Sequence, residues 1–244
     1  MVMEDFESRA QFKLLAGVPL IIHISGRNFS KILGHTTKPY SKELAGCFHH
    51  ALRSLCMSVE GTVFGYTHND EILLITINDG VPWYDNDVQK IASATASMTT
   101  FYFYQNVIAT DLEINLDTIF TSSAFIVPSA ESAADIIIEA QLKCQLKAVN
   151  DVCFYTFIDM GMTKDQVIDL LSDMTPEAKT EILRAKAGIN FSDLPLTFRR
   201  GAACYRVPKL INGIEKYKFA IHEDLPLFDD EKSRICNIIN GNHD

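Results

Sequence analysis

The chain has 244 residues and a formal net charge of −9, and 47% of its residues are hydrophobic and 22% charged. This composition is typical of one large globular domain, or of one domain with an appendage, and it argues against a protein that binds nucleic acid over its whole surface. The sequence has no apolar run of the roughly 18 residues that a membrane span needs, and its acidic N-terminus lacks the pattern of a signal peptide. We therefore expect a cytoplasmic protein.

The cysteine, histidine and basic residues indicate which kinds of binding site the chain could contain. The six cysteines lack zinc spacing and the seven histidines lack ligand spacing, so we expect reduced thiols and no structural metal. Residues 184–218 include eight basic residues and two acidic ones, although the whole chain is acidic. Such a stripe is either a solvated face or a confined phosphate-binding surface, and within it Arg199 and Arg200 are the best candidates to contact RNA.

The first part of the chain predicts the order β-α-β-β-α-β, after a short helix at 4–15. The elements are a strand at 18–24, a helix that Ser41 caps, a hairpin around 65–75, a helix that Asp85 or Asn86 caps, and a strand at 122–127. This is the ferredoxin-like order, in which the first strand and the hairpin are neighbours.

From residue 129 the pattern is mainly helical. We expect one long or two broken helices over 131–159, then helices at 164–171 and 176–186, and a loop at 194–201. A hairpin with Asn212-Gly213 at its turn follows, and the acidic tail from Glu223 is either a subunit contact or a disordered end. The fold class is therefore α+β, with a ferredoxin-like domain at 1–128 and a helical extension with a β-hairpin at 129–244.

The hairpin carries two adjacent carboxylates, Asp70 and Glu71, near the start of its second strand. Because side chains alternate along a strand, one of them points to each face of the sheet. A carboxylate at a hairpin tip can hold Mg²⁺, although a solvated turn is the simpler interpretation. The ferredoxin-like order also places a small-residue turn close to Asp70. This turn is Ser25-Gly26-Arg27-Asn28-Phe29, and its backbone N–H groups could bind phosphate. We interpret His35 and His68 as loop histidines and His23 as a core or interface histidine.

Several of these stretches together resemble one family. The stretches 24–29, Lys38-Pro39, 66–71 and Gly161-Met162-Thr163, and the Arg200-Gly201 loop, are similar to the tRNA-histidine guanylyltransferase family and its relatives, 3′–5′ polymerases that add nucleotides to RNA 5′ ends. The resemblance covers nearly the whole chain in the right order. It implies a polymerase-palm domain with helical additions, assembly as a homotetramer, and phosphoryl transfer with two Mg²⁺ ions.

The resemblance also assigns residues. It implies that Asp70 is catalytic and binds metal, that Glu71 assists it, and that the Gly26 carbonyl is a further metal ligand. Lys38 and Asn69 fall where the family contacts nucleotide phosphates, and the expected nucleotide site is completed by Ser25, Gly26, Arg27, Asn28 and Phe29. The implied partners are GTP, ATP and a tRNA or tRNA-like RNA, and the expected RNA-contacting residues are Arg199, Arg200 and Lys147.

Two departures bear on activity. Ser25 stands where the family has a bridging aspartate, so the site loses one negative charge facing two dications. Ser25 is therefore an introduced substitution, a sign of lost catalysis with nucleotide binding retained, or a change for which Glu71 compensates. The stretch 143–151 lacks a histidine that guanylyltransferases use to recognise the histidine tRNA, which favours the like-protein branch that repairs 5′-truncated RNA.

Our leading hypothesis is a Mg²⁺-dependent nucleotidyltransferase that adds nucleotides to the 5′ end of tRNA or tRNA-like RNA. The alternative is a catalytically impaired palm protein that binds nucleotide or RNA as an oligomer. A third interpretation, a nucleotidyl cyclase, predicts a cyclic product from triphosphate alone.

Overall fold

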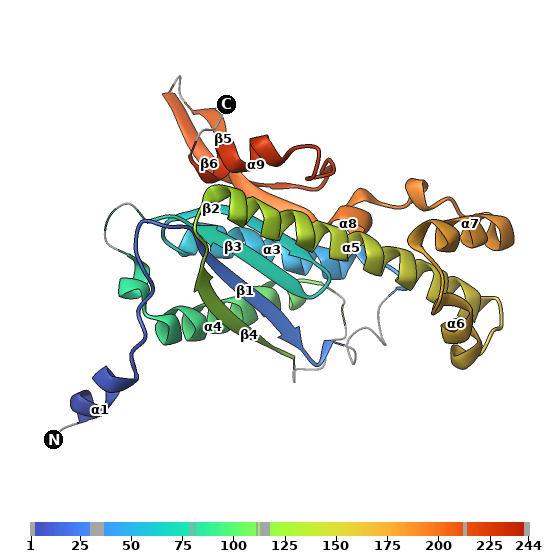
Figure 1. Ribbon diagram of the computed structural model, residues 1–244, viewed down its shortest axis with the longest axis horizontal. Helices are drawn as coiled ribbons and strands as arrows, with labels where there is room; N and C mark the ends of the chain where they lie inside the picture. The colour runs from blue at the N-terminus through green and yellow to red at the C-terminus, as the bar shows by residue number, and fades with distance from the viewer. Residues whose placement is uncertain are drawn as a thin grey trace.

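The computed structural model describes residues 3–29, 37–78, 80, 82–110, 112, 118–211 and 214–241. Figure 1 shows one sheet with helices on both faces and a group of helices beyond one end of it. The strands are β1 Leu20–Arg27, β2 Thr62–His68, β3 Glu71–Thr76, β4 Ile119–Ile126, β5 Ala202–Ile211 and β6 Ile214–His222. The longer helices are α3 Lys42–Ser58, α4 Val88–Val107, α5 Ala130–Asp159 and α7 Pro176–Ala187. The shorter helices are α1 Met3–Ala10, α6 Lys164–Leu171, α8 Leu196–Arg200 and α9 Lys232–Ile239, with 3₁₀ turns at Trp83–Asn86 and Phe191–Asp193.

The six strands form one antiparallel sheet in the order β4-β1-β3-β2-β5-β6. The first four strands, with α3 and α4, have the predicted β-α-β-β-α-β order, and β1 lies beside β3 of the central hairpin. The α+β ferredoxin-like fold is confirmed. The C-terminal hairpin, β5 and β6, pairs with β2 and continues the same sheet, so residues 129–244 share a sheet with residues 1–128.

Both faces of the sheet are buried. On one face, Ile22 and Ile24 of β1 pack with α3 and α4. On the other, Ile21 of β1 packs with α5 and α9. Because a strand covered on both faces needs apolar side chains in both directions, β1 and β3 are nearly continuous apolar runs.

The second half of α5 extends beyond the sheet (Figure 1) and packs against α6, α7 and α8 in a separate apolar cluster. The predicted starts of α6 and α7 are confirmed. Thr163 caps α6 and Thr175 caps α7, which starts with a proline. The long helix over 131–159 is one continuous helix, α5.

The entry to α4 differs from the prediction. Helix α1 ends at Ala10 rather than near residue 15, because the chain after it pairs with the segment before α4: Lys13 forms a bridge with Asp87, and the Val88 N–H donates to the Phe12 carbonyl. Asp87, not Asp85 or Asn86, caps α4 through its Oδ1 atom, since both predicted caps have positive φ in the preceding turn.

Strand β1 is longer than predicted and runs through Ser25, Gly26 and Arg27. These residues remain in the sheet because β3 and β4 pair with β1 on either side. The chain leaves the strand at Asn28, which has φ of 64°. The predicted loop at 194–201 contains α8, and the acidic tail forms α9, whose buried residues are Ile235, Ile238 and Ile239. His35 and the predicted Asn212-Gly213 turn lie outside the described residues.

All six cysteines are free thiols, and five of them are buried, as expected for core residues. Within the described segments, no helix has both the length and the apolar character required to cross a membrane.

Candidate functional site

The hairpin tip holds Asp70 against β1. Asn69 and Asp70 form the turn between β2 and β3, and the Gly26 N–H of β1 donates to the Asp70 carbonyl at 2.8 Å. A Cβ atom at Gly26 would lie 3.2 Å from the Asp70 Cβ and 2.1 Å from the ring of Phe29, so only glycine fits between them. The expected proximity of the Ser25-Gly26 stretch to Asp70 is confirmed.

Asp70 lines a pocket that four parts of the chain enclose. These are the hairpin tip, the residues before and within the first turns of α3, the middle of α5, and the region around α8. Its polar lining includes Tyr40, Ser41, His49, Thr67, His68, Asn69, Asp70, Lys147, Asp151 and Thr197, and its aromatic lining also includes Phe29, Phe48 and Phe198. Aromatic walls with few charged groups are typical of sites for small organic ligands.

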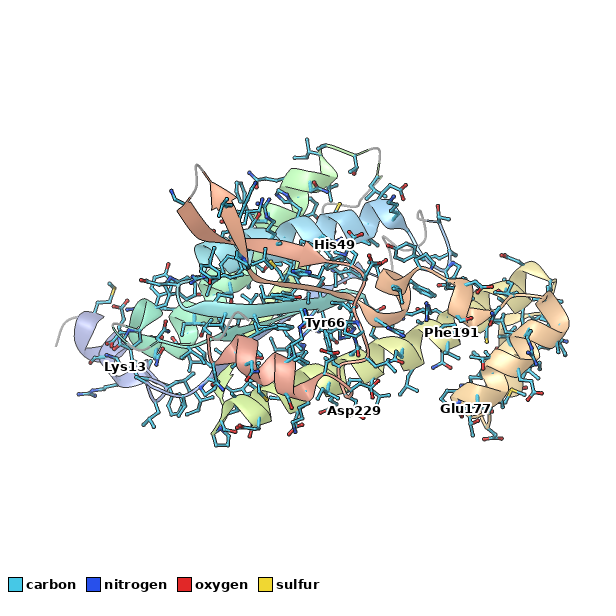
Figure 2. The ribbon with its side chains drawn as sticks, turned by 90° about the horizontal axis from the view of Figure 1, so that it is seen from above. Lys13, His49, Tyr66, Glu177, Phe191 and Asp229 are labelled. Atoms are coloured by element: carbon cyan, nitrogen blue, oxygen red, sulfur yellow. The ribbon has the colours of Figure 1, made fainter. Side chains whose placement is uncertain are left out.

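The α8 side of this pocket is fixed to β2 by close backbone contacts. The Tyr66 hydroxyl donates to the Arg200 carbonyl at 2.8 Å. Gly201, the next residue, has φ of 71°, and a Cβ atom there would lie 2.5 Å from the Thr67 carbonyl oxygen. In Figure 2, Tyr66 is labelled on the sheet and His49 on the helix α3 that covers it. Glycine at position 201 therefore brings α8 against the sheet.

Burial makes the Asp70 carboxyl group harder to ionise. Removal from water raises the pKa of its carboxyl group, and the charge of Glu71 raises it further, whereas a backbone hydrogen bond and the Lys147 ammonium lower it. A cation that enters the pocket would therefore stabilise the ionised form of Asp70.

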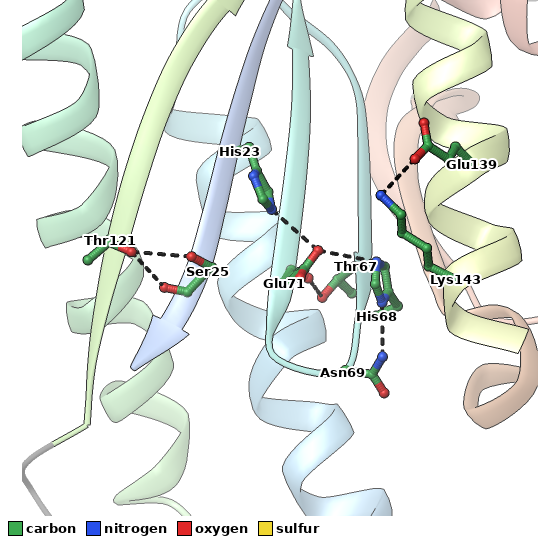
Figure 3. Close-up of polar contacts among 9 residues, drawn as sticks. All are labelled: His23, Ser25, Thr67, His68, Asn69, Glu71, Thr121, Glu139 and Lys143. Atoms are coloured by element: carbon green, nitrogen blue, oxygen red, sulfur yellow. Dashed lines mark hydrogen bonds and ion pairs between the residues drawn. The ribbon is translucent and has the colours of Figure 1, made fainter. Parts of the chain in front are cut away.

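Four polar side chains form a row across four neighbouring strands. In the sheet register Thr121 of β4 pairs with Ser25, Ser25 pairs with Glu71, and Glu71 pairs with His68 of β2. Figure 3 shows these four residues side by side. The Ser25 hydroxyl lies 3.2 Å from the Thr121 hydroxyl, so its hydrogen-bonding capacity is directed to β4.

Glu71 is bound to histidines on the α5 face of the sheet. Its Oε2 atom lies 3.3 Å from His23 Nε2 and 3.6 Å from His68 Nε2. The hydrogen bond from His23 lowers the pKa of Glu71, although burial opposes this effect. Asp70 instead packs beside Gly26 and Phe29, whose ring belongs to the α3 and α4 core. The two carboxylates point to opposite faces, as predicted.

Sequence reasoning missed His68, which is buried at the end of β2 and is not a loop residue. Burial lowers the pKa of His68 to about 4, so the ring is neutral at neutral pH. The Asn69 amide can donate to its Nδ1 atom at 3.0 Å, which leaves the proton on Nε2, facing Glu71. A hairpin turn of two residues, Asn69 and Asp70, pairs His68 with Glu71. This register is the sequence signal that could have placed His68 in a strand beside Glu71.

Two of the seven predicted nucleotide-site residues, Phe29 and Asn69, line the pocket with Asp70. Lys147, which we predicted to contact RNA, lines it as well. Lys38 is half-buried beside Tyr155 of α5, with its Nζ atom 5.3 Å from the ring centroid. Phe29 is also a buried core residue. Arg27 and Asn28 are exposed at the end of β1 and are not among the residues that line the pocket.

Arg199 and Arg200 have structural contacts. The Arg199 Nε atom donates to the Leu194 carbonyl at 2.9 Å, and its guanidinium lies 5.8 Å from the ring centroid of Phe191. The Arg200 Nη1 atom donates to the Leu225 carbonyl at 2.7 Å and so ties α8 to the C-terminal segment. Contact of these arginines with RNA stays a prediction.

Comparison with known proteins identifies the family. A family model described as tRNAHis guanylyltransferase matches residues 1–128, and a model described as the Thg1 C terminal domain matches residues 134–234. The chain belongs to the tRNAHis guanylyltransferase family. The resemblance seen in the sequence motifs is therefore confirmed.

The relatives of this guanylyltransferase-family chain are distant. It is 24% identical to tRNA(His) guanylyltransferase 1 of Arabidopsis thaliana, over 86% of the chain and 38% of that protein, and so spans about two fifths of its length. It is also 24% identical to the tRNA(His) guanylyltransferase of Neurospora crassa, over 86% of the chain and 75% of that protein.

Solved structures of the guanylyltransferase family have the same fold. A bacterial tRNA(His) guanylyltransferase-like protein in complex with ATP superposes with a TM-score of 0.83, at 22% identity and 97% coverage of both chains. The guanylyltransferase of Saccharomyces cerevisiae gives a TM-score of 0.78 at 16% identity, over 95% of this chain and all of that one. These similarities confirm the palm-type fold that the resemblance implies.

The donor groups in this guanylyltransferase-family site fit one magnesium ion better than two. Asp70 offers one carboxylate, and the resemblance adds the carbonyl of the adjoining Gly26. Mg²⁺ commonly binds through one or two carboxylates together with substrate phosphates and waters. A bridged pair of ions requires a further carboxylate. Ser25 supplies only a neutral hydroxyl, and the carboxylate of Glu71 is occupied by His23 and lies on the other face. Asp151, the other carboxylate that lines the pocket, is paired with Lys147. None of these residues therefore supplies the free bridging carboxylate that a two-ion arrangement requires.

Proposed function

We propose that this protein is a nucleotidyltransferase that adds nucleotides to the 5′ end of a tRNA or tRNA-like RNA. The observation that carries the proposal is the position of Asp70, which the hairpin turn and Gly26 hold at the wall of an aromatic-lined pocket. Family membership supports the substrate class, and the ATP- and GTP-bound relatives, each at 22% identity, make both nucleotides natural candidates.

In this proposal the protein's own residues bind and orient the nucleotide. Asn69 would contact the triphosphate from the hairpin tip, and Lys38 would supply an ammonium group from the loop before α3. Asp70 and the Gly26 carbonyl would hold a magnesium ion that neutralises phosphate charge when it is bound. Arg199 and Arg200 would contact the RNA backbone beside the α8 wall. A cytoplasmic location and a homotetramer belong to the same proposal, and light scattering of the purified protein tests the tetramer.

The test is extension of a 5′-truncated, 5′-triphosphorylated tRNA with labelled nucleotides and Mg²⁺. We compare the unchanged chain with Asp70→Asn, and use Asp169→Asn, an exposed carboxylate on α6, as the matched control. We expect Asp70→Asn to abolish extension and Asp169→Asn to leave it unchanged. Equal activity of Asp70→Asn and the unchanged chain would refute the site assignment.

The position of Ser25 favours one second candidate, a palm protein that binds nucleotide without transferring it. Its hydroxyl bonds to Thr121 and the neighbouring Glu71 bonds to His23, so neither completes a metal bridge. The same assay separates the two functions when it includes Ser25→Asp. Extension only by Ser25→Asp favours the binding protein, whereas extension by the unchanged chain favours the enzyme. A cyclic product formed without RNA would instead indicate a cyclase.

A further inference from the structure

One wall of the pocket carries an ion pair that the proposed chemistry does not use. Lys147 and Asp151 lie one turn apart on α5, and the Lys147 Nζ atom donates to Asp151 Oδ2 at 2.8 Å. Both residues line the pocket that contains Asp70. Their side chains are 46% and 29% exposed, so the pair is accessible to a ligand from solvent.

A second lysine, Lys38, lies one turn of α5 away from this ion pair. Tyr155 follows Asp151 by one turn on the same stripe of α5, and Lys38 lies over the Tyr155 ring. Burial lowers the pKa of Lys38; the charge of Asp151 raises it and the charge of Lys147 lowers it. The charges of Asp151 and Lys147 therefore both act on Lys38, which lies over the ring one turn further along α5.

The charge balance of the pocket makes this ion pair important. Among the described residues that line it, Lys147 is the only lysine or arginine, and it is opposed by the two carboxylates of Asp70 and Asp151. A nucleoside triphosphate carries about four negative charges at neutral pH, and like charges this close disfavour binding. Binding of a triphosphate therefore requires Lys147 to exchange Asp151 for phosphate.

We propose that Lys147 and Lys38 form a clamp for the phosphate chain and that Asp151 is an internal placeholder, a carboxylate that pairs with Lys147 until a phosphate group displaces it. This inference rests on the proposed function in that it places a triphosphate in the pocket. It moves Lys147 from the RNA-contacting set, where sequence reasoning put it, to the nucleotide site.

The energetics favour the exchange. A partly exposed lysine–aspartate pair one turn apart on a helix contributes little to the stability of a protein, so little is lost when it opens. A phosphate group offers more negative charge and more acceptor oxygens than a carboxylate. The clamp also supplies positive charge beside Asp70, where Ser25 leaves the two-ion arrangement without a bridging ligand.

The chain contains a matched control pair. Lys143 and Glu139 form the same type of ion pair one turn earlier on α5, at 2.7 Å, and neither residue lines the pocket. The experiment measures the affinity of the full chain for GTP and ATP by calorimetry, once with Mg²⁺ and once with a chelator. It compares Lys147→Met and Asp151→Asn with the controls Lys143→Met and Glu139→Gln. Melting temperatures establish that each variant is folded.

We expect the two pocket substitutions to act in opposite directions. Lys147→Met should weaken triphosphate binding about tenfold, with a larger loss in the chelator, because a charge-assisted contact to phosphate is removed. Asp151→Asn should strengthen binding about threefold to tenfold, because the competing anion is removed while the side-chain shape is retained. The two control variants should bind within about twofold of the unchanged chain.

Three results would overturn the inference: unchanged affinity in Lys147→Met, weaker binding in Asp151→Asn, or no triphosphate binding by the unchanged chain. Failure of the proposed function gives a different result. If the two affinities shift in opposite directions but no RNA is extended, the clamp is supported and the transferase is rejected. If RNA is extended but the affinities do not shift, the transferase is supported and the clamp is rejected.

Discussion

Ser25 and Glu71 are direct partners across β1 and β3, and their side chains leave the sheet on the same face. Ser25 bonds to Thr121 on one side, and Glu71 bonds to His23 on the other. The position at which the family has a bridging aspartate is therefore built into a row of polar side chains that already contains the Glu71 carboxylate. This arrangement explains how the chain tolerates the serine without leaving its hydroxyl group unpaired.

Ser25→Asp should introduce electrostatic repulsion that metal can relieve. Directly opposed like charges on neighbouring strands destabilise a sheet by about 0.2–1 kcal/mol, and the new carboxylate should also raise the pKa of Glu71. We expect a lower melting temperature without Mg²⁺ and a larger Mg²⁺-induced rise than in the unchanged chain. Ser25→Asn, which adds size without charge, is the control. Equal Mg²⁺ responses in both variants would rule out a metal contact at position 25.

Gly26→Ala should destabilise the hairpin site. The added methyl group would meet the Phe29 ring and the Asp70 Cβ, and overpacking of this kind typically costs about 1–3 kcal/mol. Gly46→Ala in α3 is the matched control, because a Cβ there meets no atom within 4 Å. Alanine in a helix interior should stabilise the protein by about 0.5–1 kcal/mol. Urea unfolding of both variants measures the difference, and a Gly26→Ala variant as stable as Gly46→Ala would contradict the close packing.

His68 should make stability depend on pH between about 4 and 6.5. In that range the unfolded chain binds a proton on His68 that the buried ring of the folded protein does not accept, so stability rises with pH. The contribution reaches about 3 kcal/mol at most above pH 6.5. The charged and titratable groups that act on His68 are Glu71, His23, Lys143 and Lys147.

His68→Gln should reduce this slope, whereas His50→Gln, at an exposed position on α3, should retain it. Burial also lowers the pKa of His49 and of His222, which supply the remainder of the slope. Urea unfolding at several pH values measures both variants. The lowered pKa of Glu71 adds stability with rising pH only in a more acidic range, and the raised pKa of Asp70 acts with the opposite sign. An undiminished slope in His68→Gln would assign the pH dependence to other groups.

The two arginines beside α8 should each reduce the salt dependence of tRNA binding when replaced. For each phosphate contact that Arg199→Met or Arg200→Met removes, the slope of log K against log salt should decrease by about one. Arg53→Met is the matched control, since Arg53 also donates to a backbone carbonyl, that of Phe219. An unchanged slope together with a lower melting temperature would assign both arginines a purely structural role.

Local patterns in the sequence determined most of the secondary structure. Serine and threonine before an apolar stripe defined the starts of α3, α6 and α7, because their hydroxyls accept the free N–H groups of a first turn. The alternation of side chains along a strand was sufficient to assign Asp70 and Glu71 to opposite faces. Motif resemblance added the family, and with it the palm-type fold.

Only the tertiary structure decided the pairings between distant segments. The ends of β1 and of α1 depend on strands and turns remote in sequence, which local patterns do not reveal. The burial of His68, the engagement of Glu71 by His23, and the place of Lys147 beside Asp70 all arise where separate elements meet. Burial and neighbouring charge set the chemistry of an ionisable group, and both are properties of the folded arrangement rather than of the residue.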